Sequence, residues 1–153
     1  QNSLNFMIQK GTELGVQKFV PILSERTTVK DINIERIKKI IIESSEQSNR
    51  ISIPEIMKLN NLKNFISNFP QNGCIVFCDI NCEKSDLKNI LLKKDLGPIC
   101  ILIGPEGDFS ENERGLIIDS KQSHSISLAK NILRAETAAI AGVTLINYHL
   151  NLS

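Results

Sequence analysis

Two segments of the sequence carry residue types that suit a binding pocket. In the first, Ile103-Gly104-Pro105-Glu106-Gly107, two glycines allow the backbone to approach a ligand closely. The second runs from Ser127 to Ala139, and within it Ile132 and Leu133 could form the apolar walls of a pocket for a flat ring. The polar groups that follow, at the start of the last helix, are Arg134, Glu136 and Thr137.

The first segment has a simpler alternative, because Gly-Pro-Glu-Gly is also a common tight turn. An isolated match of this length favours the turn. Phosphate binding is disfavoured because the neighbouring residues are acidic and the sequence contains no loop of the G-x4-G-K-S type. A phosphate- or nucleotide-binding α/β domain is therefore the weakest of the functions considered.

The elements around the two segments place both of them at one edge of a sheet. Residues Pro98 to Ile103 are apolar without alternation, which predicts a central strand of a parallel sheet covered on both faces. Ligands of such sheets bind beyond the carboxyl ends of the strands, where the first loop begins. Ser110 and Glu113 have the spacing of a capping box and predict the start of a helix. A short strand at His124 to Leu128 precedes the second segment.

The rest of the chain alternates between helical periodicity and short apolar runs. We predict helices over residues 2–14, 34–49, 62–69, 87–92 and 134–150, and further strands over residues 19–23 and 74–78. The first helix is expected to end at Gly15, because glycine suits a left-handed cap. Together these elements predict one α/β domain with a mostly parallel sheet flanked by helices.

The composition is that of an ordinary globular protein, with 41% hydrophobic and 23% charged residues. No apolar run approaches the roughly 20 residues that a membrane-spanning helix needs, so we expect a soluble protein without a membrane partner. The net charge of +1 requires any contact with RNA to be local. The sequence begins at Gln1, and we expect it to be a piece of a longer chain.

The four cysteines raise the questions of a metal site and of disulfides. Because no secretory signal is visible, reduced thiols in the cytoplasm are favoured over disulfides. Cys74, Cys78 and Cys82 are spaced more widely than the C-x2-C pairs of zinc and iron–sulfur sites. The run from Cys74 to Cys78 also fits a buried strand, so we expect no metal.

The last predicted helix is rich in small residues, which allow a neighbour to approach its backbone closely. These residues are Ala135, Ala138, Ala139, Ala141 and Gly142. The neighbour is either the core of the same chain or a second copy, and we favour a homodimer.

Several motifs together resemble one known family. They are Gln9-Lys10-Gly11-Thr12-Glu13-Leu14-Gly15-Val16, Glu25-Arg26-Thr27, Glu46-Gln47-Ser48-Asn49-Arg50, Ile103 to Gly107, and Ile132-Leu133-Arg134-Ala135-Glu136-Thr137-Ala138. In this combination the chain resembles the ribosomal RNA small subunit methyltransferase E family, from about residue 6 to residue 146 and with the motifs in family order.

The resemblance implies a SPOUT-type methyltransferase domain over residues 1–153, with a C-terminal trefoil knot and a homodimeric state. It also implies S-adenosyl-L-methionine (SAM) as the cofactor and methylation of uridine N3 in 16S ribosomal RNA or the small ribosomal subunit. The N-terminal RNA-binding barrel of the family is expected to be absent from this chain. The alternative is an RNA- or cofactor-binding module of the same fold without activity.

Carried over residue by residue, the resemblance implies a cofactor pocket made mainly of backbone. Its residues are Cys78, Leu102, Ile103, Gly104, Pro105, Glu106, Gly107, Ser127, Leu128, Ala129, Ile132, Leu133 and Thr137. Arg134 would stabilise negative charge on the uracil while Glu136 accepts the N3 proton. The rival role for Glu136, capping the free amides of a helix, is slightly favoured.

Contacts with RNA phosphate are expected from Arg26, Arg50 and Lys130, although a structural role is the safer interpretation of the motif that contains Arg50. Two departures from the family pattern weaken individual assignments. Asp108 stands where the family usually has glycine, and Ala129-Lys130-Asn131 replaces Gly-Pro-Arg.

Overall fold

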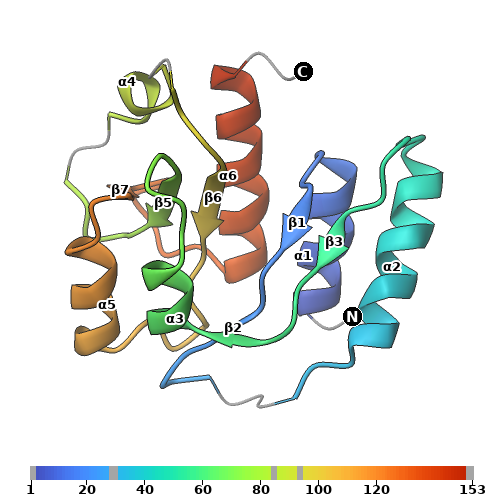
Figure 1. The fold of residues 1–153 in the computed structure, drawn as a ribbon, viewed down its shortest axis with the longest axis horizontal. Coiled ribbons are helices and arrows are strands. Elements are labelled where there is room, and N and C mark those ends of the chain that lie inside the picture. The colour runs from blue at the N-terminus through green and yellow to red at the C-terminus, as the bar shows by residue number, and fades with distance from the viewer. Residues whose placement is uncertain (1–2, 28–30, 84–85, 93–94, 151–153) are drawn as a thin grey trace.

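The computed structural model describes residues 3–27, 31–83, 86–92 and 95–150 (Figure 1). In chain order the elements are α1 (Ser3–Glu13), β1 (Lys18–Phe19), β2 (Ile22–Leu23), α2 (Ile34–Gln47), β3 (Glu55–Ile56), β4 (Asn60–Asn61), α3 (Leu62–Ser67), β5 (Cys74–Cys78), α4 (Leu87–Leu91), β6 (Ile99–Leu102), α5 (Glu111–Ile118), β7 (Ser123–Ile126) and α6 (Ala135–His149). All strand pairs within these ranges are parallel.

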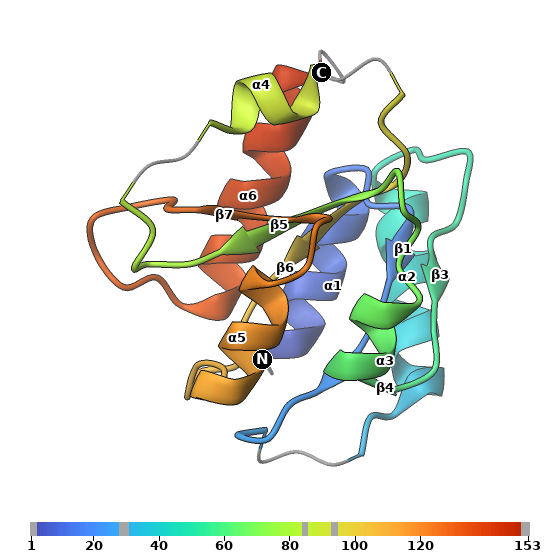
Figure 2. The same cartoon turned by 60° about the vertical axis from the view of Figure 1, so that its left-hand side comes forward.

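The main sheet has the strand order β6-β5-β7, and helices cover both of its faces. Successive side chains of a strand point to opposite faces. In β5, Ile75 and Phe77 therefore pack against α3 and α5, whereas Cys74 and Val76 pack against α4 and α6. Figure 2 shows α5 and α6 on opposite sides of this sheet. The predicted α/β architecture, with a parallel sheet flanked by helices, is confirmed.

A second core joins the first two helices to β1 and β3. Ile8, Ile37 and Ile41 are buried there, with Phe19 and Ile56 packed against them. Helix α1 packs against both α2 and α6, and Figure 1 shows it between them. The amino-terminal part of the chain is thus attached to the helix that follows the second candidate loop.

The predicted strand over residues 19–23 is divided into β1 and β2, a correction that Pro21 helps to explain, because proline has no N–H to donate to a neighbouring strand. Each half pairs with a strand that the sequence did not predict: β1 with β3, and β2 with β4. These partners contain only two residues each, too few to show any periodicity.

The strand predicted over residues 98–103 is β6, but within the described sheet it lies at an edge and not in the centre. Its apolar residues do cover both faces, because Leu102 belongs to one core and Ile99 and Ile101 to the other. A run of apolar residues indicates covered faces and carries no information about how many strands lie alongside. The central strand is β5.

The predicted helix ends agree with the structure to within a few residues. Gly15 has φ +92° directly beyond α1, as a left-handed cap requires. The capping box at the start of α5 is present, and α6 begins at Ala135 with Arg134 as its N-cap. Residue 2, the predicted first residue of α1, lies outside the described residues.

Candidate functional site

The carboxyl ends of the three strands of the main sheet meet at one edge. In the strand register, Phe77 is paired with Leu102 and Cys78 with Ile126. The segments that begin at Asp79, Ile103 and Ser127 therefore leave the sheet side by side. Open parallel α/β sheets bind their ligands at this edge. The structure thus places both candidate loops at this edge, with the segment that follows β5 between them.

The first loop is a well-defined turn. The N–H of Asp108 donates to the carbonyl of Pro105 at 2.9 Å, and the carboxylate of Asp108 accepts from the N–H of Phe109 at 2.8 Å. Asp108 has φ +59°, a conformation that glycine adopts freely and aspartate tolerates better than most residues. The backbone at this position therefore suits a glycine and also accommodates the aspartate found here. Phe109 is buried, and its ring lies 5.8 Å from that of Phe77.

Gly104 is the more tightly packed of the two glycines in this loop. A Cβ atom added there would lie 3.3 Å from Oδ1 of Asp108 and 3.4 Å from Cε2 of Phe109. At Gly107, the nearest atom to an added Cβ is the Cβ of Arg26 at 3.7 Å, so that position has room. Glu106 and Gly107 are exposed, whereas Gly104 and Pro105 are half-buried.

The loop is also held from outside. Nη1 of Arg26, in the segment after β2, donates to the carbonyl of Gly107 at 3.0 Å. At the start of α5, the hydroxyl of Ser110 accepts from the N–H of Glu113, and the Glu113 carboxylate accepts from the N–H of Ser110 at 3.0 Å. The exposed guanidinium of Arg26, predicted to contact RNA, is thus placed beside the first loop.

An ion pair that the sequence analysis missed lies at the same edge. Nη2 of Arg114 is 2.6 Å from Oδ2 of Asp79, which is buried at the end of β5. The position of Asp79 directly after a strand was visible in the sequence, but its partner on α5 was not. This pair joins the end of β5 to the helix that follows the first loop.

The second loop is more open than the first. Within it, the hydroxyl of Ser127 donates to the carbonyl of Ala129 at 3.2 Å. Lys130 and Arg134 are exposed, and Ile132 is 86% exposed. Leu133 is half-buried. In this single chain the predicted apolar wall at Ile132 therefore faces outwards.

Glu136 lies in the first turn of α6 and bonds to another helix. Its Oε2 accepts a 2.6 Å hydrogen bond from the hydroxyl of Ser3. This bond, the backbone N–H of Glu136 and the nearby charge of Arg134 lower the pKa of the carboxyl group. A lowered pKa makes Glu136 a weaker base. The Ser3 bond therefore argues against proton abstraction by Glu136 and gives its carboxylate a structural role between α1 and α6.

Cys78 and Cys100 have neutral thiols although neither residue is fully buried. Burial of the sulfur raises the pKa of each thiol to about 12, and a neighbouring thiol adds to the effect. The groups that Cys78 can contribute to a pocket are therefore its backbone and an uncharged sulfur. Among the described residues no group of three or more histidine, cysteine, aspartate or glutamate side chains is arranged to hold a metal ion.

Arg50, the second residue predicted to contact RNA, bonds to the end of α1. Its Nη1 donates to the carbonyls of Thr12 and Val16, both at 2.8 Å, and its Nη2 to the hydroxyl of Ser52 at 3.3 Å. Carbonyl groups at a helix end lack partners within the helix, and an arginine that satisfies them stabilises that end. This geometry favours the structural interpretation of Arg50.

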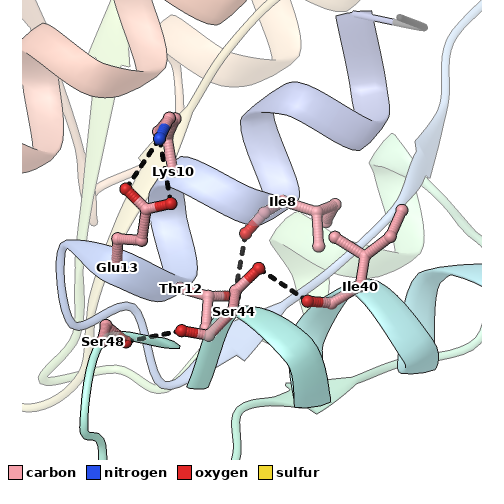
Figure 3. Close-up of polar contacts among 7 residues, drawn as sticks. All are labelled: Ile8, Lys10, Thr12, Glu13, Ile40, Ser44 and Ser48. Atoms are coloured by element: carbon pink, nitrogen blue, oxygen red, sulfur yellow. Dashed lines mark hydrogen bonds and ion pairs between the residues drawn. The ribbon is translucent and has the colours of Figure 1, made fainter. Parts of the chain in front are cut away.

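A polar groove lies between α1 and α2, with a volume of about 560 Å³. Figure 3 shows its neighbourhood, where Nζ of Lys10 contacts both carboxylate oxygens of Glu13 and the hydroxyl of Ser44 donates to the carbonyl of Ile40. The groove contains none of the predicted cofactor residues. The described part of the chain has no helix both long and apolar enough to cross a bilayer.

The fold and the loops define a parallel α/β domain whose candidate ligand edge lies at the carboxyl ends of β5, β6 and β7. The chain belongs to the RNA methyltransferase domain family, whose model matches residues 1–147. This match and the relatives described next together confirm the resemblance drawn from the sequence motifs.

Curated relatives carry the name ribosomal RNA small subunit methyltransferase E. The protein from Rickettsia conorii is 34% identical over 145 residues, which cover 94% of this chain and 58% of that protein. The protein from Aquifex aeolicus is 33% identical over 148 residues, covering 94% of this chain and 62% of the relative. The chain thus spans about three fifths of the length of these relatives.

Solved structures show the same fold over almost the whole chain. Ribosomal RNA small subunit methyltransferase E from Neisseria gonorrhoeae, bound to S-adenosyl methionine, has a TM-score of 0.86 at 27% identity and covers 97% of this chain and 61% of its own. A putative methyltransferase from Legionella pneumophila, in complex with SAM, has a TM-score of 0.84 at 27% identity, covering 97% of this chain and 62% of its own.

Proposed function

We propose that this chain binds SAM at the carboxyl edge of its main sheet and transfers the methyl group to N3 of a uridine in 16S ribosomal RNA. The observation that carries the proposal is the meeting of the two candidate loops at one edge, in a fold shared with SAM-bound methyltransferases. The proposal includes the C-terminal trefoil knot that the family resemblance implies.

The residues at this edge fit a cationic cofactor that carries a flat ring. Glu106 offers an exposed carboxylate to the positive charges of SAM, and Ile132 offers exposed apolar surface to its adenine. We assign the cofactor contacts to the backbone of residues 102–107, 127–129 and 132–133, together with Cys78 and Thr137. When bound, SAM supplies an electrophilic methyl group on a sulfonium. The chain supplies binding and orientation.

Arg134 is the residue to which we assign transition-state stabilisation. Uridine N3 must lose a proton before or during attack on the methyl group, and negative charge then develops on the uracil oxygens. The Arg134 side chain is exposed and makes no side-chain cap bond to the helix that it begins. We assign Glu136 a positioning role, because its carboxylate is bound to Ser3.

For the RNA we propose phosphate contacts from Arg26 and Lys130, which are exposed on two segments that border the pocket. Arg50 is assigned to the end of α1, where its guanidinium already donates to three oxygens. With a net charge of +1, the chain must rely on such local contacts. A ribosomal RNA substrate also implies a cytoplasmic location.

We propose a homodimer formed through α6. One stripe of this helix (Ala138, Gly142 and Ile146) is buried within the chain. The face with Glu136 and Asn147 bonds to α1 and its C-terminal end. On a further face Thr137, Thr144 and Tyr148 are exposed, Tyr148 at 74%, and this face is available to a second copy of the chain. Light scattering coupled to gel filtration should report twice the chain mass.

Calorimetry with SAM, followed by methyl transfer to small ribosomal subunits that lack the modification, tests the proposal. We expect saturable binding of SAM and a methyl group on uridine N3, located by mass spectrometry of the digested RNA. Binding without transfer, in the longest form of the protein that can be made, would favour a cofactor-binding module without activity. Absence of SAM binding would contradict the assignment of the pocket.

A further inference from the structure

We propose that Glu113, which lies outside the predicted cofactor contacts, is a positioning residue that holds the first loop in its binding conformation. Its carboxylate connects the start of α5 to the segment after β2, and the loop at residues 104–110 is held between them. The expected effect on SAM binding rests on the function proposed above.

The contacts of Glu113 are made by both of its carboxylate oxygens. Oε2 accepts from the N–H of Ser110 at 3.0 Å, and Oε1 accepts from the N–H of Glu25 at 2.9 Å. The side chain is 5% exposed. A buried carboxylate is stable only when its oxygens have hydrogen-bond donors. Both oxygens of Glu113 have backbone donors, one inside the capping box and one 88 residues away in sequence.

The bond to Glu25 goes beyond what a helix cap needs. In a capping box the glutamate accepts only from the N–H of the N-cap residue. Here the second oxygen binds a turn on another segment, from Ser24 to Thr27, which is closed by the N–H of Thr27 and the carbonyl of Ser24 at 3.1 Å. Glu113 therefore joins two parts of the chain that local helix formation would leave separate.

The same turn holds the first loop at a second point. Arg26 lies next to Glu25, and its Nη1 donates to the carbonyl of Gly107 at 3.0 Å. The loop is thus tied to the turn through Gly107 and, by way of Glu113, through Ser110. Loss of the Glu113 bond would free the turn and, with it, the contact of Arg26 to the loop.

The residue after Glu113 strengthens the arrangement from the other side. Arg114 forms the ion pair with the buried Asp79 at the end of β5. The first turn of α5 therefore contacts the segments that follow both β2 and β5. Removing either contact should loosen the pocket without removing any group that touches the cofactor.

Glu25→Pro is the sharpest test, because it deletes one N–H and leaves α5 unchanged. Residue 25 is the second residue of its turn, where proline is favoured, and its φ is not positive. Glu25→Ala is the matched control, since it removes the same exposed side chain but keeps the N–H. A second test is Glu113→Gln, which replaces one acceptor oxygen with a donor group. Its control is Glu111→Gln, which removes an exposed charge from the same helix turn.

We expect Glu25→Pro to raise the Kd for SAM about tenfold, the effect of losing one hydrogen bond to a charged group. Turnover at saturating SAM should be retained, and Glu25→Ala should bind like the wild type. Equal affinities of Glu25→Pro and Glu25→Ala for SAM would overturn the proposal. A lower melting temperature of Glu25→Pro with unchanged affinity for SAM would also overturn it, because that result would indicate a structural role alone.

Hydrogen exchange separates this inference from the proposed function. In Glu113→Gln only one acceptor oxygen remains, so the amide hydrogen of Glu25 or that of Ser110 should exchange about tenfold faster, whereas in Glu111→Gln neither should. If the wild type fails to bind SAM, the proposed function is wrong. Hydrogen exchange alone then tests whether Glu113 connects the turn at Ser24 to Thr27 with the start of α5. Unchanged exchange at both Glu25 and Ser110 in Glu113→Gln would show that the connection does not exist.

Discussion

The hydroxyl of Ser3 donates a 2.6 Å hydrogen bond to Oε2 of Glu136, and this bond joins the first turn of α1 to the first turn of α6. The two residues are 133 positions apart in sequence. The carboxylate is therefore already engaged at the position where the family resemblance suggested a base. Arg134 lies at the same helix start with an exposed side chain, available to a ligand.

Ser3→Ala should raise the pKa of Glu136 towards its ordinary value of 4.5, because the Ser3 bond is the main cause of the lowered value. A carboxyl whose folded pKa lies below its unfolded pKa stabilises the fold above the unfolded pKa, and this contribution disappears as pH falls through the folded pKa. The variant should therefore be less stable than the wild type near neutral pH and equally stable in acid. Carboxyl NMR titration and urea unfolding across pH measure both effects; a pH-independent difference would contradict the assignment.

Arg134→Ala should leave the fold intact and abolish most methyl transfer. The side chain is exposed, so its loss should change the melting temperature little. Loss of a preorganised donor to a developing anion lowers turnover by about a hundredfold or more. Lys39→Ala, at an exposed position on α2, is the control for loss of one positive charge. Steady-state kinetics with the ribosomal subunit gives the answer, and full activity would remove Arg134 from the mechanism.

Gly104→Val should abolish SAM binding. Even a single Cβ at this position would lie 3.3 Å from Asp108 and 3.4 Å from Phe109, and the branched side chain adds two more carbons. Gly115→Ala, in α5, is the control, because nothing lies within 4 Å of a Cβ added at Gly115. The control should raise the free energy of unfolding by about 0.5–1 kcal/mol and bind SAM normally. Calorimetry that finds unchanged affinity for Gly104→Val would place the pocket elsewhere.

Arg50→Ala should reduce the free energy of unfolding by about 1–3 kcal/mol, because the carbonyls of Thr12 in α1 and of Val16 beyond it lose a charged donor. Arg50→Lys should recover part of the loss, since an ammonium can reach fewer of the three oxygens at once. Urea unfolding measures the change. If the stability is unchanged but the affinity for RNA falls, Arg50 contacts the substrate and the structural interpretation is wrong.

Cys78 and Cys100 should resist alkylation in the folded protein. Burial raises the pKa of each thiol to about 12, and the thiolate is the reactive form. Treatment with iodoacetamide at about pH 8, a pH far below both raised values, should leave both residues unlabelled in the native state and label them in urea. Mass spectrometry of the digest locates the label. Rapid labelling of either residue in the folded protein would show that its sulfur is accessible and ionised.

Local signals in the sequence were sufficient for most of the elements. The capping box of Ser110 and Glu113 depends on contacts within one helical turn, so its spacing alone predicts it. The end of α1 at Gly15 depends on the conformational freedom of one residue. The unbroken apolar run at β5 predicted a buried strand, because burial on both faces requires it.

The contacts that assemble the site could be decided only by the tertiary structure. Asp79 and Arg114 are 35 residues apart, Ser3 and Glu136 are 133 apart, and no periodicity connects such positions. The edge position of β6 and the two-residue strands β3 and β4 likewise follow from which segments lie side by side. The sequence by itself indicated which two loops are the candidates for binding the ligand. Only the tertiary structure decided which side chains hold those loops, because those side chains contact residues far away in sequence. Such contacts depend on the packing of the whole core and not on local conformational preference.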